Sequence, residues 1–183
     1  MKEECDGAMF GSVSSPSHKV AGYSSPIVAL RKHLDLYANV RPVTSVSHIG
    51  GIKAPHTVDM VIVRENTECL YIKKEELTTD PSTGEKVAFA TRKISQGASS
   101  RIGKMAFEIA QRRGKERLEK PTFWKGEPKV TIVHKSNVLS VTDGLFRETV
   151  RAVKEQSGGK YDGVVMEEQL VDSMVYRMFR EPE

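Results

Sequence analysis

The stretch Val130-Thr131-Ile132-Val133 is a short apolar run that passes directly into the polar residues His134 and Lys135. Two other runs have the same layout, at residues 58–63 and 164–166. Short continuous apolar runs of this kind are typical of buried strands. Segments with helical spacing of apolar residues lie between and after these runs, and strands that alternate with helices predict an α/β sheet.

The helical segments are residues 102–110, 146–153 and 170–178. Another helix is predicted near the front, because Ser25 and Pro26 are followed by an apolar stripe. Serine is a preferred N-cap residue, and proline is common in the first helical turn. Residues 38–43 are expected to be extended, with Pro42 confining them to an edge or a strand end.

Residues 75–95 predict a β-hairpin arm. The turn-rich segment 80–84 (Asp-Pro-Ser-Thr-Gly) is followed by the strand-like segment 87–91 (Val-Ala-Phe-Ala-Thr). A lone two-stranded hairpin is marginally stable in water. We therefore expect the arm to pair with the same arm of a second copy, burying Val87 or Phe89 against its mate.

The composition is that of a globular protein of 183 residues, with 38% hydrophobic residues and a formal net charge of +4. A mild and dispersed basic charge suits an anionic small molecule as well as nucleic acid. The two cysteines, Cys5 and Cys69, have no metal-ligand spacing and favour a reducing compartment. The sequence has no apolar stretch of the ~18 residues that a membrane helix needs and no glycine-rich nucleotide motif. We expect neither a membrane nor a nucleic acid as partner, although the basic segment 112–120 leaves nucleic-acid binding as a weaker hypothesis.

Several cationic groups are candidates for binding a polycarboxylate. The helix that begins at Ser25 offers backbone N–H groups and a positive dipole end. Arg31 lies further along this helix, while Arg41 and Arg64 both follow apolar runs. Guanidinium groups bind carboxylates through paired hydrogen bonds. Each residue taken singly also fits a plain cap or a solvated surface position.

Lys135, Tyr71 and Asp172 are candidates for the chemistry itself. Ligands bind outside the carboxyl ends of strands in open α/β sheets, and Lys135 follows an apolar run there, where a lowered pKa would make it a base. Tyr71 is a candidate proton donor, and Asp172 a candidate ligand for a hard metal ion. The alternatives are an exposed lysine, a packing tyrosine and a solvated aspartate.

Four motifs occur in order along the chain and resemble those of the isocitrate, isopropylmalate and homoisocitrate dehydrogenases. They are residues 25–31 (SPIVALR), 34–42 (LDLYANVRP), 64–71 (RENTECLY) and 134–139 (HKSNVL). The resemblance implies a large domain built from both chain ends and a smaller domain built from the middle. Residues 1–36 would then belong to the large domain, and residues 37–183 to the smaller substrate and dimerisation domain, with its hairpin arm at about residues 75–95.

The resemblance also assigns roles to the candidate residues. The substrate carboxylates would be held by Ser25, Arg31, Arg41, Arg64 and His18. Lys135 would deprotonate the 2-hydroxyl group, Tyr71 would protonate the enolate carbon, and Asn137 would lie near the nicotinamide of NAD. Asp172 would bind Mg²⁺ or Mn²⁺, and both Asp172 and Lys135 would serve the site of a neighbouring subunit.

Within this family, residues 14–25 resemble the fungal homoisocitrate enzymes, and Ile27 stands where isocitrate enzymes commonly carry Asn. The Cys69-Leu70-Tyr71 segment points the same way. The resemblance therefore predicts NAD-dependent and Mg²⁺-dependent oxidative decarboxylation of homoisocitrate, a small tricarboxylic 2-hydroxyacid, to 2-oxoadipate in lysine biosynthesis. Isocitrate and 3-isopropylmalate are the alternative substrates. The fungal resemblance suggests a mitochondrial location, with a cytoplasmic one as the alternative.

The family's N-terminal Gly-rich segment and its Gly-Asp-x-x-Ser-Asp motif are absent from residues 1–183. We therefore expect the chain to be truncated at both ends and inactive alone. A homodimer or higher homo-oligomer is expected. The hypothesis from another functional class is a catalytically inactive, dimerising fragment.

Overall fold

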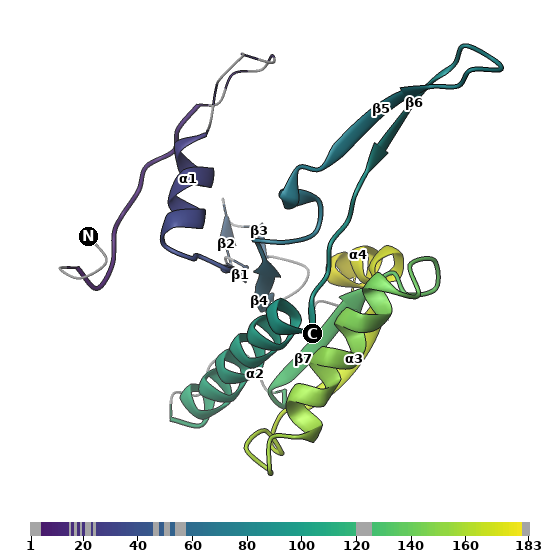
Figure 1. Cartoon of the computed structure of the whole chain (residues 1–183). Coiled ribbons are helices and arrows are strands. Elements are labelled where there is room, and N and C mark those ends of the chain that lie inside the picture. Colours follow the sequence, from purple (N-terminus) through teal and green to yellow (C-terminus); the bar gives the residue numbers. More distant parts are fainter. Residues whose placement is uncertain are drawn as a thin grey trace.

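The computed structural model describes residues 5–14, 16, 18, 20, 23, 25–45, 48–49, 52–53, 58–119 and 126–180. Its helices and strands follow one another as α1 (Pro26–His33), β1 (Ala38–Thr44), β2 (His48–Ile49), β3 (Ile52–Lys53), β4 (Asp59–Glu65), β5 (Glu75–Thr79), β6 (Lys86–Ala90), α2 (Gln96–Glu119), β7 (Lys129–His134), α3 (Thr142–Glu155), β8 (Val165–Leu170) and α4 (Val171–Arg180). A short 3₁₀ turn, Leu70–Ile72, follows β4. The mixed α/β class predicted from the sequence is confirmed (Figure 1).

The main core lies between the parallel pair β7–β8 and the helices α2 and α3. Its buried residues are Phe107, Ala110, Val130, Ile132, Val150, Tyr161 and Val164. The rings of Phe107 and Tyr161 stack with centroids 5.2 Å apart. Gly103 permits a close approach of the two helices, because a Cβ atom at this position would lie 3.3 Å from Val150 Cγ1.

The two faces of β7–β8 have different neighbours. Val130, Ile132 and His134 alternate along β7 and are buried toward α2 and α3. The opposite face carries Glu167, whose Oε1 accepts a hydrogen bond from Thr131 Oγ1 at 2.7 Å. Arg177 of α4 donates to the same oxygen at 3.1 Å, so α4 is tied to this second face.

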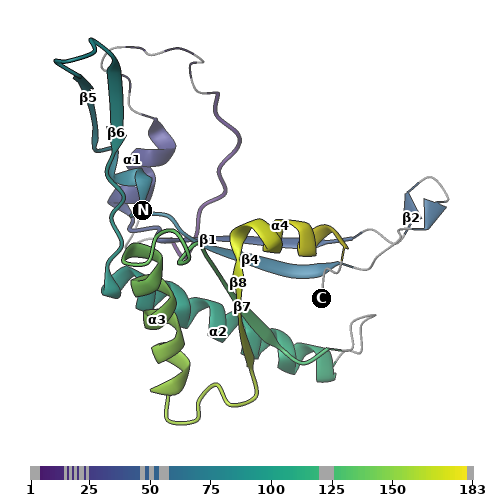
Figure 2. The same ribbon diagram turned by 90° about the vertical axis from the view of Figure 1, so that its right-hand side faces the viewer.

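The antiparallel pair β1–β4 forms a second small unit against α2. Asp59 of β4 pairs with Arg113 and, at 3.4 Å, with Arg117, both on α2. Near the start of α2, Arg101 bonds Asp35 at 3.0 Å and lies 4.3 Å from the ring centroid of Tyr37. Figure 2 shows β1 and β4 side by side, with α2 crossing between this pair and α3.

Three details differ from the sequence-based expectations. The described strands form four two-stranded sheets, and β4 pairs with β1 instead of joining β7–β8. A run of apolar residues predicts a strand but carries no information about its partner. Glu167 and Glu168, expected beyond the third strand, lie inside β8. Ser25 occupies the N-cap position, but its side chain makes no capping bond; its carbonyl oxygen accepts from the Ala29 N–H at 3.1 Å.

The hairpin arm expected at residues 75–95 is confirmed as β5–β6, which projects away from the core in Figures 1 and 2. Its turn is closed by Asp80, which accepts hydrogen bonds from the backbone and side chain of Ser82 at 2.7 and 2.5 Å. Leu77 and Phe89 are 67% and 58% exposed. None of the helices in the described part of the chain has the length and apolarity needed to cross a bilayer.

Glu68 fastens the base of the arm to the start of α2. Its Oε2 accepts from the Ser95 N–H at 2.7 Å, and its Oε1 lies 3.2 Å from Lys93 Nζ. Burial alone would raise the pKa of Glu68, but the hydrogen bonds from Ser95 and Lys93 outweigh it and hold the pKa below its usual range. The charged carboxylate therefore stabilises the fold.

Glu68→Gln should lower the free energy of unfolding at pH 7 by about 1–3 kcal/mol, since it removes a partly buried charged acceptor. A folded-state pKa below the unfolded one gives stability that is present above the unfolded pKa and is lost as pH falls through the folded pKa. The difference between variant and wild type should therefore shrink on acidification. Thermal unfolding from pH 3 to 8 measures it, with Glu76→Gln on the exposed arm as control. A pH-independent difference would contradict the role of the charge.

Candidate functional site

The exposed face of β1–β4 carries two of the candidate arginines. The register places Asn39 opposite Arg64 and Arg41 opposite Ile62. Side chains of directly paired residues, and of residues two apart on one strand, point to the same face of a sheet. Arg41 Nε donates to Asn39 Oδ1 at 2.9 Å, which holds that guanidinium over the ribbon. Arg41 and Arg64 therefore project together from the face that α2 does not cover.

Tyr71 joins this face from the 3₁₀ turn after β4. Arg64 Nη2 donates to the Tyr71 hydroxyl oxygen, and the guanidinium carbon lies 4.9 Å from the ring centroid. The intervening loop is held by Glu65, whose carboxylate accepts from the Thr67 N–H at 3.0 Å and from Thr67 Oγ1 at 2.6 Å. Arg41, Arg64 and Tyr71 form one cluster, which we call the arginine face.

Lys135 and Asp172 form the second cluster, the lysine–aspartate pair. Lys135 follows β7 and Asp172 lies in the first turn of α4 after β8; these parallel strands pair His134 with Leu170 at their ends. Lys135 Nζ donates to Asp172 Oδ2. The lysine side chain is 31% exposed and the aspartate side chain 65% exposed. Both groups are thus accessible at the carboxyl edge of the parallel strands, as expected for a ligand site.

The remaining candidates lie apart from these two clusters. Ser25 and Arg31 are half-buried on α1, while His18 and Asn137 are exposed. Across the ranges that the structure describes, no hydrogen bond or ion pair connects these residues to the arginine face, and none connects the arginine face to the lysine–aspartate pair. The roles assigned to the candidate residues by resemblance stay predictions.

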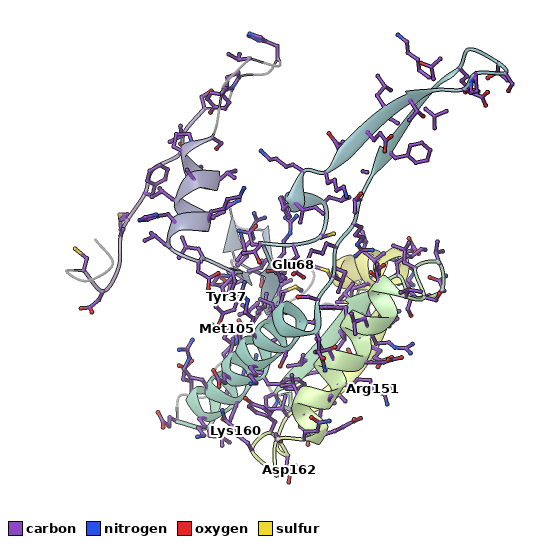
Figure 3. The ribbon with its side chains drawn as sticks, viewed as in Figure 1. Tyr37, Glu68, Met105, Arg151, Lys160 and Asp162 are labelled. Atoms are coloured by element: carbon purple, nitrogen blue, oxygen red, sulfur yellow. The ribbon has the colours of Figure 1, made fainter. Side chains whose placement is uncertain are left out.

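Figure 3 shows the side chains around α2, with Tyr37 and Glu68 labelled at one end of the helix and Lys160 and Asp162 at the other. The first end lies near the arginine face, because Glu68 precedes Tyr71 by three residues and binds Ser95 just ahead of α2. At the other end, Lys160 pairs with Glu108 at 2.9 Å and thereby lowers the pKa of that carboxyl group. That ion pair closes the loop before β8 onto α2.

Three arginines of the basic segment 112–120 have acidic neighbours. Arg113 and Arg117 pair with Asp59, and Arg112 lies 3.8 Å from Glu116. A nucleic-acid interface needs cations directed at phosphates, with aromatic platforms for single strands. This pairing of charges gives no support to the nucleic-acid hypothesis.

A complete metal site does not occur among the described residues, where no group of three or more His, Cys, Asp or Glu side chains converges. Asp172, the candidate metal ligand, contributes one accessible carboxylate. Mg²⁺ and similar cations bind through one or two carboxylates together with water and substrate oxygens. Asp172 fits one such ligand, and further ligands would come from outside these residues.

Sequence reasoning missed two residues that support Lys135. The Lys135 backbone N–H donates to Asp143 Oδ2 at 2.5 Å, and Arg92 pairs with the other oxygen of this carboxylate. The only sequence signal was an acidic residue just before the predicted helix at residues 146–153, which is common as a dipole effect. Asn39 and Glu65, which orient Arg41 and the Tyr71 loop, were also missed, because their roles arise from pairing across the ribbon and from a local turn.

Comparison with known proteins gives one consistent result. The isocitrate/isopropylmalate dehydrogenase family model matches residues 1–183. Homoisocitrate dehydrogenase of Methanocaldococcus jannaschii is 35% identical over 190 residues, covering 99% of this chain and 48% of the relative. Isocitrate/homoisocitrate dehydrogenase of Thermus thermophilus is 38% identical over 179 residues, covering 98% and 46%.

The structure gives a concordant match. The crystal structure of isocitrate dehydrogenase from Methylococcus capsulatus superposes with a TM-score of 0.72 at 33% identity, over 93% of this chain and 44% of that one. The chain therefore spans about half the length of the relatives that it matches. The similarity covers both the arginine face and the lysine–aspartate pair.

Proposed function

Since this chain belongs to the isocitrate/isopropylmalate dehydrogenase family, we propose that it carries part of the active site of an NAD-dependent oxidative decarboxylase of homoisocitrate. One observation carries the proposal: the chain presents an arginine cluster and a lysine–aspartate pair on two different strand pairs. Names of the relatives include homoisocitrate and isocitrate, and the family name includes isopropylmalate. Isocitrate and 3-isopropylmalate are therefore the alternative substrates.

Substrate binding falls to the arginine face. Arg41 and Arg64 project from one exposed ribbon face, and guanidinium forks match carboxylates through two parallel hydrogen bonds. Ser25 and Arg31 on α1, with His18 before it, would hold the remaining carboxylates of a tricarboxylic substrate. Residues 1–36 would belong to the larger domain and residues 37–183 to the smaller one.

Two proton transfers fall to Lys135 and Tyr71. Lys135 would remove the proton from the 2-hydroxyl group, while a hydride leaves the carbon that carries this hydroxyl group. After the carboxyl group departs as carbon dioxide, Tyr71 would deliver a proton to the enolate carbon. Asn137 would lie near the nicotinamide of NAD, which would supply the hydride acceptor, and Asp172 would be one ligand of a Mg²⁺ or Mn²⁺ ion, which would supply charge stabilisation at the hydroxyl oxygen and its neighbouring carboxylate. The orientation of the lysine and the tyrosine is what this chain contributes.

In the proposed enzyme the site would be shared between two chains. The lysine–aspartate pair would reach the arginine face of a second copy, and the exposed arm would help to hold the two copies together. The alternative function is a dimerising module without catalysis; no group of three or more candidate metal ligands converges among the described residues. A mitochondrial location is proposed from the fungal resemblance alone.

The substrate proposal is tested with the full-length protein that carries residues 1–183. Homoisocitrate, isocitrate and 3-isopropylmalate are each supplied with NAD and Mg²⁺, and the formation of NADH is followed. We expect the highest kcat/KM with homoisocitrate. A higher value for another acid would reassign the substrate, and oxidation of none of the three would favour the non-catalytic module.

Lys135→Met should lower kcat about 10²–10⁴-fold and leave KM nearly unchanged, because a base acts mainly in the transition state. Steady-state kinetics of the full-length protein provides the measurement. Lys129→Met, at the opposite end of β7, is the control for loss of a lysine on the same strand. An unchanged kcat in Lys135→Met would exclude Lys135 as the base.

Tyr71→Phe keeps the ring beside Arg64 and removes only the hydroxyl group. It should impair protonation of the enolate more than hydride transfer, so that the oxidised keto acid is decarboxylated and released abnormally. Rates of NADH formation and carbon dioxide release are compared, with Tyr37→Phe, beside Arg101, as control. Wild-type behaviour in both partial reactions would make Tyr71 a packing residue.

Phe89→Lys should weaken the dimer, because it places a charge on the exposed apolar face of the arm that Val87 shares. The hairpin itself should persist, since the new lysine lies opposite Glu76 in the register. Sedimentation should show monomers at concentrations where the wild type is dimeric, together with loss of turnover. Glu76→Gln changes the charge equally without removing apolar surface and serves as control. A monomeric wild type with full specific activity would reject both the arm pairing and the shared site.

A further inference from the structure

Asp143 is a buried carboxylate that has no part in the proposed reaction. The residue is 3% exposed and lies in the first turn of α3. Aspartate is rarely buried this deeply unless it is paired, because an unpaired charge is costly to remove from water. The neighbours of its two oxygens therefore show what it holds in place.

The first oxygen holds the peptide of Lys135. Asp143 Oδ2 accepts a hydrogen bond from the Lys135 N–H at 2.5 Å. On its other side, the Lys135 carbonyl oxygen accepts from the Leu139 N–H at 2.9 Å, and the Leu139 carbonyl oxygen accepts from the Asp143 N–H at 3.0 Å. Residues 135–143 thus close into a loop around the point where the Lys135 side chain leaves the backbone.

The second oxygen faces the base of the arm. Arg92 Nη2 lies 2.7 Å from Asp143 Oδ1, a charge pair that lacks the angle of a directed hydrogen bond. Arg92 Nε in turn donates to Cys69 Sγ at 3.2 Å. Cys69 lies two residues before Tyr71. Its backbone N–H donates a hydrogen bond to the Lys93 carbonyl oxygen at 2.8 Å, so this loop is bridged to the base of the arm.

We propose that Asp143 is a positioning residue for Lys135, and that Arg92 ties this position to the loop that carries Tyr71. The inference rests on the proposed function, in which Lys135 is the base and Tyr71 the proton donor. A lysine side chain has four rotatable bonds, so its amine is placed correctly only if its backbone is held. If the site is shared, Tyr71 serves the site of its own chain and Lys135 serves the site of the second copy. The Arg92–Asp143 contact then links these two parts of one chain.

Two substitutions separate the two contacts of Asp143. Asp143→Asn keeps an oxygen that accepts from the Lys135 N–H but removes the charge that faces Arg92. Asp143→Ala removes both contacts. Val150→Ala, buried in the same helix α3, is the control because it disturbs core packing without touching Lys135.

In the full-length protein, Asp143→Ala should lower kcat about 10–100-fold with KM within about twofold, since a misplaced base loses rate rather than affinity. Asp143→Asn should retain most of the wild-type kcat, and Arg92→Ala should resemble Asp143→Asn. Val150→Ala should lower the melting temperature and leave kcat nearly unchanged. Two outcomes would overturn the proposal. One is that Val150→Ala, at a similar loss of melting temperature, loses as much kcat as Asp143→Ala. The other is that Asp143→Asn has a kcat as low as that of Asp143→Ala.

A second measurement does not need turnover. Hydrogen exchange at the Lys135 amide, followed by mass spectrometry of peptides that cover residues 134–139, should be faster in Asp143→Ala and near wild type in Asp143→Asn. Unchanged exchange in Asp143→Ala would overturn the positioning role whatever the enzyme's substrate. If the wild type oxidises none of the three acids, the proposed function fails, while the exchange result still decides whether Asp143 holds Lys135.

Discussion

The packing of α2 against two separate strand pairs is the constraint on which the rest of the structure depends. One side of the helix buries Phe107 and Ala110 in the core with β7 and α3. Full burial of a side chain such as Phe107 contributes about 1.5–3 kcal/mol. Another side carries the arginines that bind Asp35 and Asp59 at the two ends of β1–β4. Without this helix, the arginine face and the lysine–aspartate pair would have no defined relation to each other.

The two interfaces of α2 differ in kind, and this difference bears on motion. The α3 side is apolar and close-packed, with Gly103 allowing the helices to approach. The β1–β4 side is held largely by ion pairs, whose partners are 15–62% exposed at the side-chain level. The Arg101–Asp35 pair, whose carboxylate is 62% exposed, contributes little and is sensitive to salt. Relative displacement of α2 and the β1–β4 pair therefore costs less than displacement within the close-packed core around β7.

Much of the fold could be predicted from the sequence, because apolar periodicity reports which face of an element is buried. The helices at residues 102–110, 146–153 and 170–178 were found in this way, and the hairpin arm was found from its turn residues and the strand-like segment after them. The partner of β4 could not be predicted, since an apolar run is compatible with either strand pair. Arg92 and Asp143 were missed because residues 51 positions apart meet only after the arm and α3 are in place.

Ligands bind outside the carboxyl ends of strands in open α/β sheets, and this rule located candidate residues correctly where the two strands are parallel neighbours. β7 and β8 are parallel neighbours, so their carboxyl ends meet, and Lys135 and Asp172 come into contact there. β4 is antiparallel to β1, so Arg64 near its end is joined by Arg41 from within the neighbouring strand. The proposed reaction needs the arginines and Lys135 around one substrate, yet the chain builds them on strand pairs with different partners and, among the described residues, without a bond between them. A second surface that brings a lysine–aspartate pair to an arginine face would complete the site, and this geometric need is the strongest support for catalysis between two copies.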